Sequence, residues 1–370
     1  MFDYKHYVPI LKWKSAELLA LKNLRRRKDV TPLIQLLMPN NKKLNEIEDL
    51  DERLVQAINI FEKEIAEIGN KLLDIWGKNK LFIDCGLLLS TKLQIKTIDQ
   101  LMAFVIPKKT IIIPVINLSA SGDVKKKICE MSKKYNTGIC IRIVCSDFLD
   151  MHKLTDDLEQ FVFLHNLVYS EVDILIDIQD IFNNESKFFN YAELSQKIPK
   201  LLVWRTFIFS SGAFPMDLSK YKPGEDAFEP RLDWNSWEKL IKKGEMKRLP
   251  SFSDYTIQHP VYREFTKFLS PSVSIKYTLN NNWHILRGSK GKFEQYLAHA
   301  NLLANSDEFF KRDYSFGDEY IAEKSEYLRE YLDKIKKNKK AGGTGNATTW
   351  ITASLNHHLE CTADQIANLS

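Results

Sequence analysis

Several features that define familiar protein classes are missing from this sequence of 370 residues. It has five cysteines, an odd number without CxxC spacing, which excludes a disulfide framework and favours a reducing compartment. No stretch approaches eighteen uncharged apolar residues, and the N-terminus carries charge throughout, so neither a membrane span nor a signal peptide is expected. We therefore predict a cytoplasmic protein that does not contact a membrane.

Short catalytic motifs are missing as well. The chain has no GxGxxG turn after its first predicted strand, no Walker phosphate loop, no HExxH and no GxSxG. These absences argue against a dinucleotide fold, a Walker-type nucleotide site, a zinc protease and a serine hydrolase. The net charge of +5 permits an anionic ligand, but it does not indicate a protein that coats nucleic acid.

What the sequence does contain is a regular alternation of short apolar runs and amphipathic segments. The runs are rich in β-branched residues and almost wholly apolar, which is typical of parallel strands covered on both faces. Eight strands are predicted, at 7–14, 31–38, 80–88, 110–118, 138–145, 172–179, 201–209 and 273–279. Apolar residues at helical spacing between them predict helices, of which the longest falls within 45–77.

Eight such units predict an α/β fold, a (β/α)8 barrel of the TIM type, with a doubly wound open sheet as the alternative. The alternation breaks at about residue 211. Residues 211–270 are rich in proline and contain Trp234 and Trp237, so we predict a long aromatic insertion before the last strand. Residues 318–370 are expected to form a C-terminal helical part of one domain that spans 1–370.

Ionisable residues interrupt five of the predicted strands. They are Lys12, Asp84, Arg142, Asp177 and Arg205, and Lys14 shares the parity of Lys12. A charge inside an apolar strand is costly unless it is paired. Because alternate residues of a barrel strand face inward, and barrel sites lie at the C-terminal strand ends, we expect these groups to converge at the mouth. Three cations against two carboxylates would suit a phosphate, nucleotide or carboxylate ligand. The alternative is a ring of ion pairs that only stabilises the barrel.

The carboxylates and histidines leave the metal question open. Asp84 and Asp177 could hold a divalent cation such as Mg²⁺, or they could only orient the arginines. His357 and His358 are adjacent on a predicted helix and point about 100° apart, so a shared zinc ion is not expected. Ser211 stands at the rim where the seventh predicted strand ends, and we expect it to be a ligand-binding residue.

An ordered series of segments resembles the beta family proteins, which are named for a bacteriophage protein. The segments include "TPLIQL", "FIDCG", "WRTFIFSSGAFP", "SDYTIQHP" and "GNATTWITASLNHHL", and the resemblance covers about 5–360. It implies context rather than a reaction, because the family is discussed near mobile elements and phage-defence loci. Two positions depart from the family pattern, Gln35 in place of a frequent Glu and Ser253 in place of a frequent Gly. The second departure predicts a strained turn before Asp254.

The resemblance also draws attention to residues outside the predicted strands. Arg231, Tyr255, Gln258, Arg287 and His357 fall on its motif positions. We expect ligand-binding roles for the first four and a catalytic role for His357 beside Asp84 and Asp177. Arg287 precedes a glycine-containing turn and a helix, which is an anion-binding geometry. Asp318, also on a motif position, is expected to cap a helix.

Together these features lead us to expect a barrel protein associated with phage defence that binds a phosphate-bearing ligand. The ligand would be a nucleotide or a nucleic-acid end, and phosphoester hydrolysis is the reaction we expect. Lys12, Arg142, Arg205 and Arg287 would neutralise the anion. The alternative is a non-catalytic module whose aromatic insertion binds a protein partner from the same defence locus.

Overall fold

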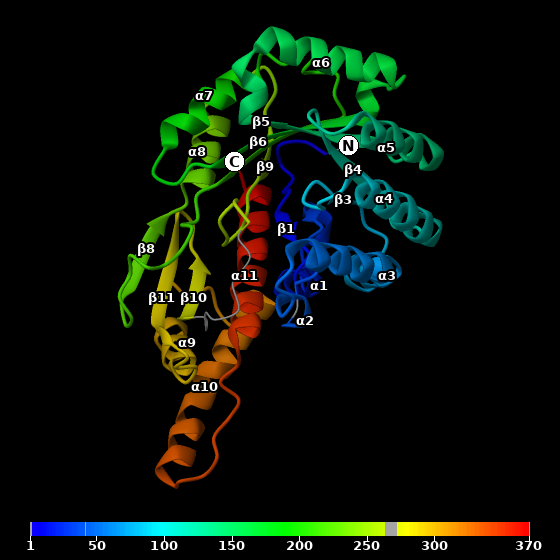
Figure 1. Ribbon diagram of the computed structural model, residues 1–370. Helices are drawn as coiled ribbons and strands as arrows, with labels where there is room; N and C mark the ends of the chain where they lie inside the picture. The colour runs from blue at the N-terminus through cyan, green and yellow to red at the C-terminus, as the bar shows by residue number, and fades with distance from the viewer. Residues whose placement is uncertain (1, 41, 263–271, 370) are drawn as a thin grey trace.

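The fold is described by a computed structural model that covers residues 2–40, 42–262 and 272–369 (Figure 1). Its larger part is a sheet of eight strands in the order β1-β2-β3-β4-β5-β6-β7-β9, all paired in parallel. The strands are β1 (Ile10–Lys12), β2 (Leu33–Gln35), β3 (Leu81–Asp84), β4 (Ile112–Asn117), β5 (Ile139–Val144), β6 (Val172–Asp180), β7 (Thr206–Gly212) and β9 (Ser251–Ser253).

The sheet closes on itself between its first and last strands. The amide of Val8 donates to the carbonyl of Phe252 at 2.9 Å, and the amide of Ile10 donates to the carbonyl of Asp254 at 2.8 Å. Closure removes the exposed strand edges that an open sheet would leave. The predicted (β/α)8 barrel is therefore confirmed, and the alternative open sheet is not what forms.

Helices cover the outside of the barrel, as the helical spacing predicts. They are α1 (Ser15–Lys22), α2 (Lys42–Asn45), α3 (Leu50–Trp76), α4 (Thr91–Val105), α5 (Gly122–Tyr135), α6 (Met151–Leu164) and α7 (Glu185–Ser195). Several begin at side-chain caps of the expected type, such as Asp49 before α3 and Ser90 before α4. The apolar stripe of α3 is buried at Phe61, Ile65 and Leu72, so it packs this helix onto the barrel.

A second, antiparallel sheet stands beside the barrel. It consists of β8 (Asp226–Pro230), β10 (Ser272–Thr278) and β11 (Asn282–Lys290), in the order β10-β11-β8. Three further helices accompany it, α9 (Gln295–Ala304), α10 (Phe316–Lys336) and α11 (Ala347–Ala367), whereas α8 (Leu232–Lys243) packs against α7 and β7 of the barrel. In Figure 1, α11 runs between the barrel and this sheet, while α10 projects away from the body of the molecule. No helix in the described ranges is long and apolar enough to cross a membrane.

The identity of the eighth barrel strand differs from the prediction. Residues 273–279 were expected to close the barrel, but β10 lies in the second sheet, and β9 closes the barrel instead. The reason is compositional, since β9 is Ser-Phe-Ser and carries no apolar run to mark it. The predicted insertion thus contains β8, α8 and the last barrel strand, and its part from 263 to 270 lies outside the described residues.

The start of the seventh strand also differs. Residues 201–205 were predicted as strand, but they form turns, and β7 begins at Thr206. Lys200 has a positive φ of 52°, and the amide of Val203 turns back to the carbonyl of Lys200 at 2.8 Å. Local turn geometry has overridden a strand-like composition here. The shift places Arg205 before the strand rather than near its middle.

Candidate functional site

The centre of the barrel mouth is occupied by Arg142 of β5, which is buried among three partners. Its guanidinium donates to Asp177 on β6, through Nε at 2.9 Å and through Nη2, and to Asp84 on β3 through Nη1. Nη2 also donates to the hydroxyl of Tyr255 at 2.8 Å, and that hydroxyl donates to Asp177 at 2.7 Å. Asp84, Arg142 and Asp177 therefore converge, as the parity of the strands indicated, and Tyr255, to which the family resemblance pointed, joins them.

The protonation states in this cluster follow from burial and charge. Burial opposes the charged form of Arg142, but Tyr255, Asp177 and Asp84 raise its pKa well above the ordinary value. Burial, together with Asp177 and Asp84, raises the pKa of Tyr255, against the influence of Arg142, so its hydroxyl keeps its proton and can donate. Gln35 adds a hydrogen bond from Nε2 to Asp84 at 3.2 Å. The cluster is a satisfied ion network.

This network affects whether Asp84 and Asp177 could hold a divalent cation. Both carboxylates already bind the Arg142 guanidinium, so a metal ion there would have to displace a buried positive charge. In the part of the chain that the structure describes, no group of three or more histidine, cysteine, aspartate or glutamate side chains could hold a metal ion. The residues present fit an orienting role for Asp84 and Asp177 better than metal coordination.

Arg205 lies at the opposite end of the barrel, and this corrects its expected place. It forms a two-pronged ion pair with Asp173 at the start of β6, with distances of 2.9 and 2.7 Å, and donates to the carbonyl of Thr137 at 2.9 Å. Thr206 donates to the same carboxylate at 2.6 Å. Because the strand begins only at Thr206, Arg205 lies at the N-terminal end of the barrel, where side chains serve stability rather than chemistry.

Two other predicted arginines bind backbone carbonyls rather than an open cavity. Arg231 is fully buried and donates to the carbonyls of Leu279 and Asn280 and to two side chains of α11. Arg287 lies on β11 and donates to the carbonyls of Leu218 and Tyr221. Both arginines tie connecting segments to the second sheet, so the anion-binding geometry expected at Arg287 is not what its neighbours show.

The two adjacent histidines are both wholly buried, between α11 and its neighbours. His357 contacts Asp318 through Nδ1 and the carbonyl of Thr278 through Nε2, each at 2.8 Å. His358 contacts Asp254 through Nε2 at 2.9 Å and the hydroxyl of Thr278 through Nδ1 at 2.9 Å. Both nitrogens of each ring are thus occupied by protein groups. This arrangement gives His357 a bridging role in the interior, and a catalytic role stays a prediction.

The structure also locates three other residues that the sequence singled out, Ser253, Asp318 and Ser211. Ser253 is an ordinary strand residue of β9, so the strained turn expected there is wrong, and the positive φ of 59° falls on Thr256 instead. The N-cap of α10 is Ser315 rather than Asp318. The hydroxyl of Ser315 accepts a hydrogen bond from the amide of Asp318 at 3.1 Å. Ser211 is buried in β7, and its hydroxyl has no hydrogen-bond partner among the described residues.

A cavity of about 220 Å³ opens beside the Arg142 network, over the C-terminal ends of β7, β9 and β1. Its charged and polar lining comes from Lys12, Lys14, Glu17, Gln258, His259, Tyr262 and Lys276. We call it the mouth pocket. Glu17 accepts hydrogen bonds from the amide of Lys12 and, at 2.9 Å, from the side chain of Gln258. The Lys12 ammonium lies 5.4 Å from the centre of the Tyr255 ring, which links the pocket to the Arg142 network.

Burial shifts the ionisation of the groups that line the mouth pocket. Burial lowers the pKa of Lys12, and Glu17 partly offsets this. Burial raises the pKa of Glu17, against the influence of Lys12 and its hydrogen bonds. Burial alone lowers the pKa of Lys276 to about 8. The sequence pointed to Lys12, Lys14 and Gln258, but Lys276 was missed because the register of a second sheet brings it here.

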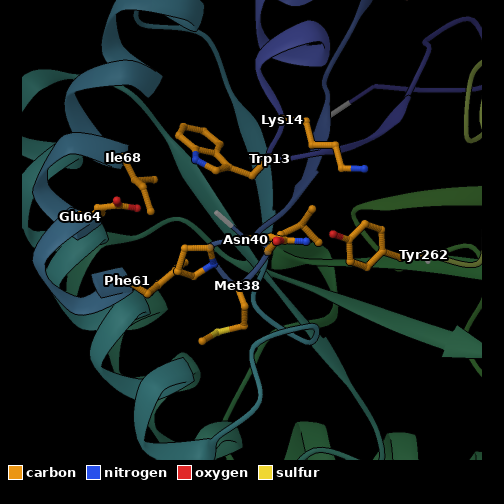
Figure 2. A pocket seen from close by; sticks show the side chains of 10 residues that line it. Trp13, Lys14, Met38, Asn40, Phe61, Glu64, Ile68 and Tyr262 are labelled. Carbon is orange, nitrogen blue, oxygen red and sulfur yellow. The ribbon is translucent and has the colours of Figure 1, made fainter. Parts of the chain in front are cut away.

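A second cavity, of about 390 Å³, adjoins the mouth pocket and shares Lys14 and Tyr262 with it (Figure 2). It lies after β1 and β2 and against α3, and Figure 2 shows Trp13, Phe61 and Ile68 along one side of it, with Tyr262 on the other. Lys14 stands 4.8 Å from the centre of the Tyr262 ring, between the two cavities. We call this second cavity the aromatic pocket, and it extends the mouth pocket with an apolar surface.

The fold and this mouth define the class as a parallel (β/α)8 barrel with an antiparallel side sheet and a lysine-lined mouth. The chain belongs to the Beta protein family, whose sequence model matches residues 7–364. No curated protein matches the chain.

Among solved structures, the chain is similar to a type I 3-dehydroquinate dehydratase from Clostridium difficile with covalently modified comenic acid. The identity is 10%, the match covers 68% of this chain and 85% of the other, and the TM-score is 0.38. A likeness this distant carries no argument about what this chain binds or catalyses.

Proposed function

We propose that the chain binds a small phosphate-bearing ligand in the mouth pocket, with its phosphate against the amino groups of Lys12 and Lys14 and with Lys276 close by. The observation that carries the proposal is that three lysines line one small cavity. The described lining contains one carboxylate, Glu17, and its oxygens already accept hydrogen bonds from Lys12 and Gln258. A bound anion would offset the mutual repulsion of the three ammonium groups.

The position of the mouth pocket in the fold supports the same proposal. It lies over β7, β9 and β1, and barrels frequently bind phosphate near their last two strands. Helix α1 begins beside the pocket at Ser15, and its N-cap residue Lys14 provides no side-chain hydrogen bond to the first turn. The positive end of this helix dipole therefore adds to the field of the lysines.

The adjoining aromatic pocket favours a ligand with a flat or apolar body over inorganic phosphate. Trp13, Phe61 and Tyr262 line it, and aromatic faces of this kind stack on nucleobases. A nucleotide, or the end of a nucleic-acid strand, would place its phosphate at Lys14 and its base in the aromatic pocket. We therefore keep a nucleotide as the leading candidate.

Four finer expectations have less support and stay predictions. Phosphoester hydrolysis by Asp84 and Asp177 would need carboxylates that are free to act, whereas Arg142 binds both. The alternative of a partner-binding insertion relied on Trp234 and Trp237, which are buried against Phe252. A role in phage defence and a place in the cytoplasm, which the scattered cysteines suggested, likewise stay predictions.

Calorimetric titration with AMP and with adenosine tests the proposed ligand class. We expect AMP to bind and adenosine to bind more weakly, because the phosphate contacts are lost. Lys14→Gln should weaken AMP binding about tenfold, the loss of one charge-assisted hydrogen bond. Lys197→Gln, an exposed lysine after α7 at the other end of the barrel, should leave it unchanged. Equal affinity for AMP and adenosine, or an equal loss in both variants, would contradict the proposal.

A further inference from the structure

Lys276 belongs to the second sheet, yet it faces the mouth of the barrel. On β10 it lies opposite Ile285 of β11, and Ile285 is part of the apolar cluster that continues into the barrel wall. Residues 275 and 277 point to the other face of the sheet, where they pack in a separate cluster. The strand register therefore decides that Lys276 lines the mouth pocket.

Burial of the Lys276 amino group favours its uncharged form, although its contact with the Phe214 ring favours the charged one. Nζ donates to the carbonyl of Ile257 at 3.1 Å and lies 4.5 Å from the centre of the Phe214 ring. Within the described ranges, no carboxylate forms an ion pair with it. With a pKa of about 8, the free amine is roughly two to three hundred times more abundant at neutral pH than in an ordinary lysine.

We propose that Lys276 is a nucleophilic amine that forms an imine with a phosphate-bearing aldehyde or ketone bound in the mouth pocket. The inference rests on the proposed function, since Lys12 and Lys14 would hold the phosphate and so bring the carbonyl group to Nζ. One hydrogen bond from Nζ to Ile257 still leaves the nitrogen lone pair free to attack. The substrate class is thus narrowed to anions that also carry a carbonyl group.

The chemistry of this step balances without a further reactant. The lone pair of Nζ attacks the carbonyl carbon, and a carbon–nitrogen bond forms as the carbonyl π bond opens. Nζ then gives up its two protons to the departing oxygen, which leaves as water, and a carbon–nitrogen double bond remains. Neither an oxidant nor a reductant takes part.

Other ionisable groups share the cavity with this amine. They are Lys12, Lys14, Glu17, His259 and Tyr262. Burial is nevertheless the cause of the lowered pKa of Lys276. His259 lies 3.4 Å from Asp180, which draws it toward the rim of β6. Glu17 partly offsets the effect of burial on the pKa of Lys12, whereas no carboxylate does so for Lys276 within the described ranges.

Pyridoxal 5′-phosphate, an aldehyde that carries a phosphate, is the reagent that tests the proposal on the full chain. Borohydride reduction fixes any imine as a stable amine, and peptide mass spectrometry then locates it. At pH 7 we expect the adduct on Lys276, formed on the order of tenfold or more faster than on exposed lysines. AMP should compete with it, and pyridoxal, which lacks the phosphate, should react more slowly at the same position.

Two variants separate the imine from the phosphate site. Lys276→Arg keeps the positive charge but cannot form an imine, so it should lose the adduct while calorimetry still detects binding of pyridoxal 5′-phosphate. Lys290→Arg, at an exposed position on the same sheet, should keep the adduct on Lys276. Circular dichroism checks that both variants are folded. If one is not, the position of the adduct in the unaltered chain, located by peptide mass spectrometry, decides whether Lys276 forms the imine.

The outcomes are distinguishable. Adducts spread over exposed lysines, with no preference for Lys276, would overturn the imine proposal even if the phosphate binds. Equal labelling of Lys276 by pyridoxal and pyridoxal 5′-phosphate, without competition by AMP, would support the reactive amine and contradict the phosphate site.

Discussion

At the scale of single residues, Arg142 is the side chain on which the barrel mouth most depends. It is almost inaccessible to solvent and forms ion pairs with Asp84 and Asp177. Each partner is buried too, so neither carboxylate can turn to water if the guanidinium is removed. Removing Arg142 alone would leave the charges of Asp84 and Asp177 buried without a partner, which destabilises the fold. Replacing all three residues by apolar ones could leave the free energy of unfolding unchanged.

Arg142→Leu should lower the free energy of unfolding by about 3–5 kcal/mol, because it leaves two buried carboxylates without a partner. Lys71→Ala removes an exposed ion pair with Glu67 on α3 and should cost about 0.5 kcal/mol or less. Urea denaturation of both variants measures the difference. Similar small losses in the two would show that the Arg142 network carries little of the stability of the mouth.

At the scale of elements, the contact between α10 and α11 fixes the position of the C-terminal helices. Gly317 on α10 lies so close to α11 that an added Cβ would meet the carbonyl oxygen of Ala353 at 2.1 Å. The Gly317 amide also donates to the side chain of Asn356 at 3.0 Å. The close approach allows Asp318, the next residue, to reach His357. A glycine is needed here for space and not for an unusual φ.

Gly317→Ala should destabilise the protein by about 1–3 kcal/mol, since backbone atoms cannot give way as a side chain could. Gly342→Ala is the matched change in the loop between the same two helices, where an added Cβ meets nothing within 4 Å. It should alter stability by less than about 0.5 kcal/mol. Thermal unfolding compares the two variants. An equal effect from both would contradict the close helix contact.

At the scale of the molecule, the barrel and the second sheet are joined by a buried polar network and a shared apolar core. Thr278 of β10 binds both histidines of α11, and His358 in turn binds Asp254 beside β9. Trp283 and Ile285 of β11 belong to the same apolar cluster as the barrel wall. Burial of this face means that neither part has its own complete core, so we expect one cooperative unit.

Hydrogen exchange can test this cooperativity. Amides of β6 in the barrel and of β11 in the second sheet should exchange with the same free energy of opening, equal to that of global unfolding. In Thr278→Val, which removes the hydroxyl that binds His358, both free energies should fall together by about 1–3 kcal/mol. Exchange of β11 at a clearly lower free energy than β6 would show that the second sheet opens on its own.

The sequence by itself determined the architecture and part of the site. Apolar runs separated by helical stripes predict a parallel sheet covered on both faces, and their number, eight, favours a closed barrel over an open sheet. Strand parity predicts the meeting of Asp84, Arg142 and Asp177. Tertiary structure decided the rest. The last strand, Ser251–Ser253, has no compositional signal, Arg205 was moved to the other end of the barrel by a turn, and Lys276 reached the mouth through a register between strands distant from the barrel. Such placements depend on contacts between segments that are distant in the sequence, so they cannot be predicted from local sequence patterns.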